Sequence, residues 1–193
     1  MKYINQIAMT FLVSTVLFTA CKKDNNTILE NPTVNEEELI TTLRLVVTNS
    51  SGFNKTFNYK VDNGIGNANP STPVIDNVVL SANTMYNVEV QVWNESVTPA
   101  EDITEEVKSE SDAHLFLFAS APTSGAGAIT FNNGSKDAVG KPFNQTIECS
   151  TGGAGTGSLT VTLKHQPTDK NATTPDAAGG ETDAQAVFPV TLQ

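Results

Sequence analysis

The sequence predicts an all-β protein, an antiparallel β-sandwich of about eight strands with one short helix. Three observations lead to this prediction. Apolar and polar residues alternate with period two in several segments, and clusters of Gly, Asn, Pro and Ser separate these segments. One segment alone carries a helix-start signature. The only cysteines are Cys21 and Cys149, and Cys21 has another predicted use, so packing rather than a disulfide must stabilise the fold.

Residues 1–20 have the features of a lipoprotein signal peptide. A basic residue precedes an apolar run from Ile7 to Phe18, and about a dozen residues are too few to cross a hydrocarbon core of about 30 Å as a helix. Ala20 directly before Cys21 resembles the lipobox of bacterial lipoproteins, with Phe18 where Leu is usual. The resemblance implies cleavage after Ala20 and lipidation of Cys21, including a palmitate-type acyl chain. The alternative is an ordinary secretory signal followed by a chance cysteine.

This resemblance implies a membrane-anchored protein. Residues 21–35 would then form a lipid-anchored flexible tether, and residues 36–193 would form the β-sandwich domain. Lys22 stands where an Asp would resemble the retention signal of the inner membrane. We therefore expect a lipid anchor in the outer membrane, with the domain on its periplasmic face or at the cell surface. Several acyl chains would make the attachment stable, since one chain alone binds only marginally.

The chain is strongly acidic. It has 11 Lys and Arg residues against 21 Asp and Glu residues, for a formal net charge of −10. Such a surface repels nucleic acid and anionic headgroups and attracts cations, so we expect no nucleic-acid partner. A negative charge of this size also keeps a protein soluble, and the composition alone leaves both interpretations open.

The first two strands are expected over residues 39–47 and 53–61, where apolar residues recur at every second position. A turn at 50–52 would join them. Residues 62–73 are rich in Gly and Asn and include two prolines, which predicts a loop.

Residues 80–92 carry the most diagnostic local pattern of the sequence. Its apolar and hydroxyl positions are Leu80, Thr84, Tyr86, Val88, Val90 and Val92. This order resembles the Leu-x-Pro-x-Thr-x-Tyr-x-Val-x-Val segment of fibronectin type III domains, with Ala82 where the family has Pro. The resemblance implies an Ig-like sandwich in which Tyr86 forms a tyrosine corner. Its ring would be buried beside Leu80, and its hydroxyl would bond to backbone a few residues upstream.

The helix is expected to start at Thr98. Thr98 can cap it, Pro99 suits its first position, and Glu101 completes a capping box. Glu105 would lie on its water-facing side.

The next part of the chain predicts three strands and one turn. Residues 113–118 are apolar on both faces, which predicts a central strand. A short strand at 129–131 is followed by Asn132-Asn133-Gly134, whose chemistry predicts a tight hairpin turn. Residues 143–149 then alternate as a strand.

The end of the chain predicts two further strands. Residues 159–163 alternate cleanly after the glycine-rich stretch 152–157, which predicts a flexible hairpin connection. The last strand covers 184–192, and Pro189 predicts that it lies at a sheet edge because proline cannot donate to a ladder. Residues 166–182 form a long polar loop.

Two histidines and several acids form a candidate metal site. Antiparallel strands bring the end of one strand beside the start of its neighbour, so side chains at such positions can meet at one pole of the sandwich. Two imidazoles with carboxylates suit zinc, whereas carboxylates alone suit calcium. The candidate ligands are His114, His165, Glu181, Asp183 and Glu105. Their spacing matches no metal motif. The alternative is that His165 bonds backbone at a strand end and that water solvates the acids.

The sequence carries no catalytic signature, and we expect a protein that is not an enzyme. Residues 152–157 lack the Lys and the helix that follow the glycines of a phosphate loop. Cys149 has no evident His and acid partner and predicts a small buried apolar residue. Trp93 could stack on a sugar or could simply cover the sheet.

The lipobox, the tether and the segments 35–42, 94–102 and 179–183 together resemble a group of small lipoproteins of the Bacteroidota. Such proteins are sometimes labelled type 1 periplasmic-binding-fold, although no alternating strand-helix units are predicted here. The resemblance implies no established activity. We expect a non-catalytic outer-membrane lipoprotein that captures a divalent cation or small solute for an outer-membrane transporter. The alternative is a structural or protein-interaction module of the cell envelope with no small-molecule ligand.

Overall fold

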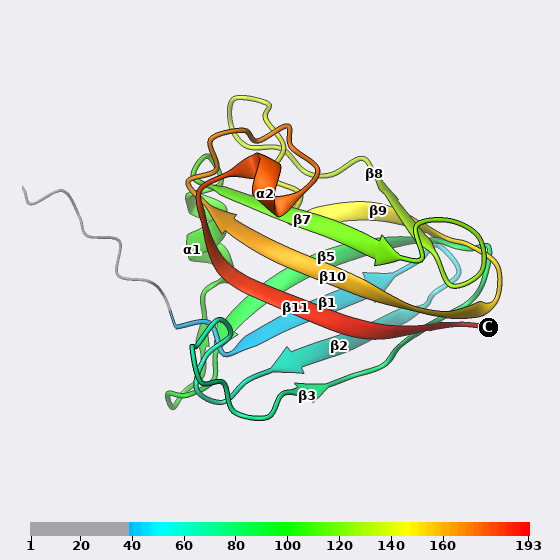
Figure 1. Cartoon of the computed structure of the whole chain (residues 1–193), viewed down its shortest axis with the longest axis horizontal. Coiled ribbons are helices and arrows are strands. Elements are labelled where there is room, and N and C mark those ends of the chain that lie inside the picture. Colours follow the sequence, from blue (N-terminus) through cyan, green and yellow to red (C-terminus); the bar gives the residue numbers. More distant parts are fainter. Residues whose placement is uncertain (1–38) are drawn as a thin grey trace, which may run out of the picture. The chain divides into compact units, whose positions relative to one another are not determined.

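The structure is a computed structural model that describes residues 39–193. The predicted signal peptide (1–20), Cys21 and the predicted tether (21–35) lie outside the described residues. In the described part, two β-sheets pack around one core, so the predicted all-β sandwich is confirmed (Figure 1). Neither of the helices in this part is long and apolar enough to cross a membrane.

The larger sheet has seven strands, and all its pairings are antiparallel. Its main path is β3 (Val74–Ile75), β2 (Asn54–Lys60), β1 (Thr42–Thr48), β5 (Met85–Asn94), β9 (Thr146–Thr151) and β8 (Ile129–Asn132), and β6 (Glu101–Asp102) pairs with β5. Period-two alternation sets the faces. Leu43 and Leu45 of β1 lie opposite Val92 and Val90 of β5, and all four side chains are fully buried.

The smaller sheet has four strands, in the order β4 (Val78–Leu80), β11 (Glu181–Leu192), β10 (Gly155–His165) and β7 (His114–Ala121). β4 and β11 are parallel, so the prediction of a wholly antiparallel sandwich is wrong at this pair. The chain leaves the larger sheet after β3, lies beside the end of β11 as β4, and returns to the larger sheet as β5. β4 flanks β11 only at Val190–Leu192, and residues 181–189 pair with β10 alone, so the predicted edge position holds for most of the last strand and is wrong only at its end. Pro189 precedes the residues that pair with β4.

β7 is an edge strand rather than the predicted central strand. Its two apolar faces have separate partners. Phe116 faces the main core, whereas Leu115 and Leu117 pack against Ala178, which ends the short helix α2 (Pro175–Ala178). The loop that carries α2 thus covers the outer face of β7, and this cover explains an apolar run that sequence reasoning assigned to a central position.

The helices and the strand number also differ from the prediction. α1 (Thr104–Ser109) begins well after Thr98, because β6 first pairs with the end of β5. α2 lies within the long polar loop, with Thr174 accepting a hydrogen bond from the Ala177 N–H. Residues 39–193 contain eleven strands rather than about eight, since β3, β4 and β6 have only two or three residues each and are too short to show a period.

Two connections were assigned wrongly from sequence. No tight turn joins β8 to β9; the chain makes an excursion over 133–145, where Phe143 and Asn144 both donate to the carbonyl of Ser135. The glycine-rich stretch after β9 crosses from the larger to the smaller sheet rather than forming a hairpin. A Cβ at Gly157 would lie only 2.6 Å from the carbonyl oxygen of Gly127, so glycine serves a close backbone approach there.

Tyr86 has the geometry of a tyrosine corner. The ring is 2% exposed, and its hydroxyl accepts a hydrogen bond of 2.9 Å from the Ser81 N–H. Phe53 packs edge-on against the ring, with centroids 5.2 Å apart, and Leu80 is buried in the same core.

Candidate metal centre

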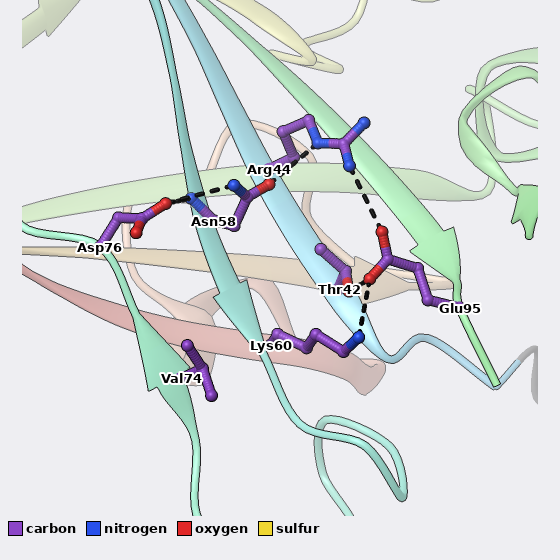
Figure 2. Close-up of a pocket in the computed structure, with 7 residues that line it drawn as sticks. All are labelled: Thr42, Arg44, Asn58, Lys60, Val74, Asp76 and Glu95. Carbon is purple, nitrogen blue, oxygen red and sulfur yellow. Dashed lines mark hydrogen bonds and ion pairs between the residues drawn. The ribbon is translucent and has the colours of Figure 1, made fainter.

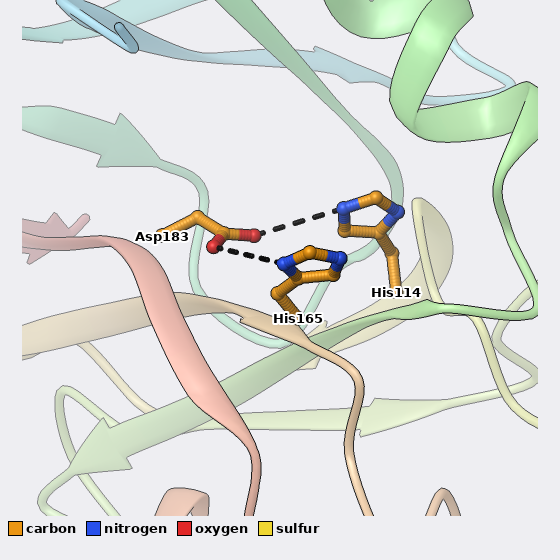
Figure 3. A group of neighbouring side chains, drawn as sticks. All are labelled: His114, His165 and Asp183. Atoms are coloured by element: carbon orange, nitrogen blue, oxygen red, sulfur yellow. Dashed lines mark ion pairs between the residues drawn. The ribbon is translucent and has the colours of Figure 1, made fainter. Parts of the chain in front are cut away.

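Three of the predicted metal ligands meet at one end of the smaller sheet (Figure 3). His114 begins β7, His165 ends β10, and Asp183 lies near the start of β11. β10 is the middle strand of the three, and its His165 is directly opposite His114 in the register. The antiparallel arrangement therefore brings together residues that are far apart in the sequence. The meeting of His165 and Asp183 agrees with the strand phases, and the pairing of β7 with β10 adds His114.

Both histidines belong to the core-facing rows of their strands. His165 continues the row of buried Leu163 on β10, and His114 continues the row of Phe116 on β7. Each residue is 6% exposed. The two rings stack with centroids 4.9 Å apart and planes 12° from parallel. The site is thus an extension of the hydrophobic core at its end, where imidazoles replace aliphatic side chains.

A β-bulge places Asp183. In the register of β10 with β11, Leu163 pairs with Ala184 and Lys164 pairs with Thr182, so Asp183 is the extra residue. Such bulges redirect a side chain relative to simple alternation. Ala184 faces the core, and an unbulged strand would turn the preceding Asp183 to the opposite face. The sequence gives no sign of this irregularity.

The spacing of the three side chains leaves room for an ion. His114 Nε2 lies 3.7 Å from Asp183 Oδ2, and His165 Nδ1 lies 3.9 Å from Asp183 Oδ1. These distances exceed the usual N–H···O range of about 2.7–3.2 Å. One ligand atom from each residue falls within 4.8 Å of the others. A tetrahedral zinc ion with bonds of about 2.0–2.1 Å needs ligand atoms about 3.3 Å apart, which small side-chain rotations would provide.

The carbonyl of Glu110 fixes the orientation of His114. His114 Nδ1 lies 3.0 Å from that oxygen, and a carbonyl can only accept, so this bond puts the proton on Nδ1 and leaves the Nε2 lone pair toward Asp183. Metal-binding histidines usually have such a partner for their second nitrogen. Burial lowers the pKa of His114, which favours the neutral imidazole that a metal requires.

Two predicted ligands lie outside this cluster. Glu181 is opposite His165 in the register, but its residue is exposed. Glu105 is on the exposed side of α1, where its carboxylate lies 3.4 Å from Lys108 Nζ. The contribution of Glu110 was missed because it comes from a main-chain oxygen at the end of α1, and such a contact has no sequence signal.

Cys149 and Trp93, the other two candidate residues from the sequence, both have structural explanations. Cys149 is 2% exposed on β9, and burial raises the pKa of its thiol to about 12, so it is not poised as a nucleophile. Trp93 has the Arg44 guanidinium 4.9 Å from its ring centroid, so a sugar could not stack on that face while Arg44 stays there.

The cluster offers two nitrogen ligands and one carboxylate to a single ion. Three protein ligands leave one tetrahedral position for water or another ligand. The Asp183 side chain is 19% exposed and the histidines are more buried, so an ion would approach past the carboxylate. Comparisons with family models, curated proteins and solved structures found no match to this chain.

Proposed function

We propose that this domain binds one divalent first-row transition metal ion, zinc first among them, through His114, His165 and Asp183. The observation that carries the proposal is the convergence of two buried imidazoles and a bulged carboxylate from three adjacent strands. The hydrogen bond of His114 to the Glu110 carbonyl adds the outer-shell contact that orients a ligand.

The donor set favours zinc over calcium. Calcium takes six to eight oxygen ligands, whereas this cluster offers two imidazole nitrogens and one carboxylate. Imidazole suits zinc, copper, iron and nickel. The sequence alone leaves zinc and calcium open, and the two nitrogens argue for zinc.

The proposed role is capture of the ion rather than catalysis. The chain as a whole has a net charge of −10, and an excess of acidic groups raises the local concentration of cations. A lipid at Cys21 would hold the domain at the outer membrane, and a bound ion could then pass to an outer-membrane transporter. The anchor, the transporter and the absence of catalysis remain parts of the proposal.

A metal titration with matched variants tests it. Purified protein is treated with a chelator, loaded with Zn²⁺, and followed by thermal melting and elemental analysis. At free zinc about 100 times Kd, binding stabilises by about 2.7 kcal/mol, which raises Tm by about 5–10 °C for a domain of this size. Asp183→Asn keeps the side-chain shape but weakens the ligand. It should reduce the shift to about 1 °C, which corresponds to a Kd about 100-fold higher.

Glu181→Gln and Glu105→Gln are the matched controls, because each removes a nearby carboxylate that lies outside the cluster. Both should keep the full zinc shift and one zinc ion per chain. Absence of a shift in the unmodified protein with Zn²⁺, Ni²⁺, Cu²⁺ and Co²⁺ would contradict the proposal. An equal shift in Asp183→Asn and the unmodified protein would contradict it as well.

A protein-interaction module is the second candidate, and one observation favours it. The edge strands β7 and β8 border a groove of about 520 Å³, which is lined in part by Phe118 and Phe131 with ring centroids 5.1 Å apart. Edge strands and aromatic side chains are common features of protein-binding surfaces. Native mass spectrometry separates the two candidates, because only the metal-binding protein would carry one bound ion per chain.

A further inference from the structure

A second polar hollow lies on the outer face of the larger sheet, away from the core (Figure 2). Its volume is about 230 Å³. It is lined by Thr42, Arg44, Asn58, Lys60, Val74, Asp76 and Glu95. The first four come from the outward-facing rows of β1 and β2, Val74 begins β3, and Asp76 follows β3. Paired strands hold most of these side chains in place.

Two cations in this hollow share one carboxylate. Arg44 is the only arginine in the chain, and its Nη2 lies 3.4 Å from Glu95 Oε1. Lys60 Nζ lies 3.1 Å from Glu95 Oε2, and the Thr42 hydroxyl donates to the same oxygen at 3.1 Å. Burial raises the pKa of Glu95, but the hydrogen bonds from Lys60 and Thr42 outweigh this effect and lower it. The group of donors is therefore suited to a carboxylate.

Glu95 lies in a loop, unlike its donors, which lie on strands. The donors stand on β1 and β2, whereas Glu95 lies just beyond the end of β5, in the connection that leads to β6. Its side chain is 24% exposed. The carboxylate can therefore turn out to water without any change in the sheet, and its departure would leave Arg44, Lys60 and Thr42 with donors for another carboxylate.

A row of hydrogen bonds extends from these donors across the hollow. Arg44 Nε donates to Asn58 Oδ1 at 2.9 Å, and Asn58 Nδ2 donates to Asp76 Oδ2 at 3.2 Å. The Asn58 N–H also donates to Asp76 Oδ2, at 2.8 Å. These bonds fix the Asn58 amide and the Asp76 carboxylate beside the cations. An acceptor such as Asp76 is matched by hydroxyl groups, which can both donate and accept.

We propose that this hollow binds a small hydroxycarboxylate. The carboxylate of the ligand takes the place of Glu95 on Arg44, Lys60 and Thr42, while its hydroxyl groups bond to Asn58 and Asp76. An arginine beside a lysine suits a carboxylate, since the guanidinium can bind both oxygens in a fixed geometry. The volume is below that of pockets for drug-sized ligands, so the ligand is small. This proposal is independent of the metal centre.

Three probes test the ligand class by calorimetric or NMR titration of the unmodified protein. Gluconate carries a carboxylate and a chain of hydroxyls, sorbitol replaces the carboxylate with a hydroxyl, and acetate keeps only the carboxylate. Gluconate should bind at least about tenfold more tightly than either of the others, because each lacks one half of the recognition. Equal binding of gluconate and sorbitol, or no binding of gluconate, would overturn the proposal.

Two variants test the mechanism of exchange. Glu95→Gln removes the internal competitor, so gluconate should bind about tenfold more tightly than to the unmodified protein. Arg44→Met should weaken gluconate at least about tenfold, through the loss of a charge-assisted contact. Weaker binding by Glu95→Gln would show that Glu95 supports the ligand rather than competes with it, and would overturn the exchange.

Lys55→Met is the control for the loss of a positive charge. Lys55 is an exposed residue of β2, and its Nζ lies 5.7 Å from the Phe53 ring centroid rather than in the hollow. This variant should bind gluconate as the unmodified protein does. Thermal melts of all three variants confirm that each is folded at the titration temperature. Equal losses in Lys55→Met and Arg44→Met would mean that net charge alone attracts the probe, and would overturn a specific site.

Discussion

Lys170 and Asp137 form a nearly buried ion pair that holds two long loops together. Lys170 Nζ lies 2.8 Å from Asp137 Oδ2, and the same ammonium donates to the carbonyl of Ser111 after α1. The hydrogen bond from Lys170 lowers the pKa of Asp137, although burial acts in the opposite direction. One lysine therefore links the loop before β11, the excursion between β8 and β9, and the turn that precedes β7.

This pair predicts a pH-dependent stability. Because folding lowers the pKa of Asp137 below its ordinary value of 3.8, the pair stabilises the fold fully above that value and less as the pH falls through the folded pKa. Lys170→Met should destabilise the protein at pH 7, and the difference from the unmodified protein should shrink below about pH 4. Urea unfolding at a series of pH values measures it.

Lys141→Met is the matched control, since Lys141 contacts Asp137 through its backbone N–H, which the substitution keeps. Its effect on stability should be small at every pH. A loss of stability in Lys170→Met that is constant from pH 7 to pH 3 would contradict the prediction.

The tyrosine corner gives a second prediction for a single residue. Tyr86→Phe removes the acceptor of the Ser81 N–H and keeps the ring, so it should cost about 1 kcal/mol in the free energy of unfolding. Tyr59→Phe, which keeps the edge-on contact with Phe188, is the comparison and should cost less. Urea titrations with unchanged slopes would support the interpretation, while equal costs for the two variants would argue against a special role for the corner.

The crossing between the two sheets gives a prediction for an element. A Cβ at Gly157 would lie 2.6 Å from the Gly127 oxygen and 2.7 Å from the Ala121 oxygen, both of them backbone atoms. Gly157→Ala should therefore cost about 1–3 kcal/mol through overpacking. At Gly153 the nearest atom would be 3.8 Å away, so Gly153→Ala should be neutral or stabilise slightly. Similar melting temperatures for the two variants would contradict this account.

At the scale of elements, the long alternating segments were predictable and the short or irregular ones were not. β1, β2, β5, β10 and β11 follow from period two, because each is long enough to show one apolar face. α1 was misplaced since the pairing of β6 with β5 overrides the capping signature at Thr98. Such pairing depends on contacts between distant segments, which local sequence does not report.

The residues of the candidate site were also predictable only in part. Strand phase predicted that His165, Glu181 and Asp183 would meet at one pole, and His114 and Glu105 were added as candidates from the acidic helix segment and the strand after it. The structure brings His114, His165 and Asp183 together, whereas Glu181 is exposed and Glu105 lies on the exposed side of α1. The outer-face hollow was not predicted at all, since Arg44, Lys60 and Glu95 are separated in the sequence and only the pairing of β1 with β2 and β5 brings them together.

For the whole molecule, the metal centre and the entry of the chain lie at the same end of the sandwich (Figure 1). The loop after β2 connects them. Ile65 donates from its N–H to the carbonyl of Ile40, and a Cβ at Gly66 would lie 3.7 Å from the Asp183 oxygen. The first described residues, from Leu39 on, therefore lie at the same end of the sandwich as the proposed metal centre.

Because Asp183 is held at a bulge, a one-residue deletion would remove the proposed metal centre without disrupting the fold. Loss of a single codon from the start of β11 would restore plain alternation and turn the carboxylate away from both imidazoles. The core residues that follow, from Ala184 to Leu192, would keep their partners on β10. Related proteins could therefore gain or lose this centre by a three-nucleotide change while the same sandwich persists.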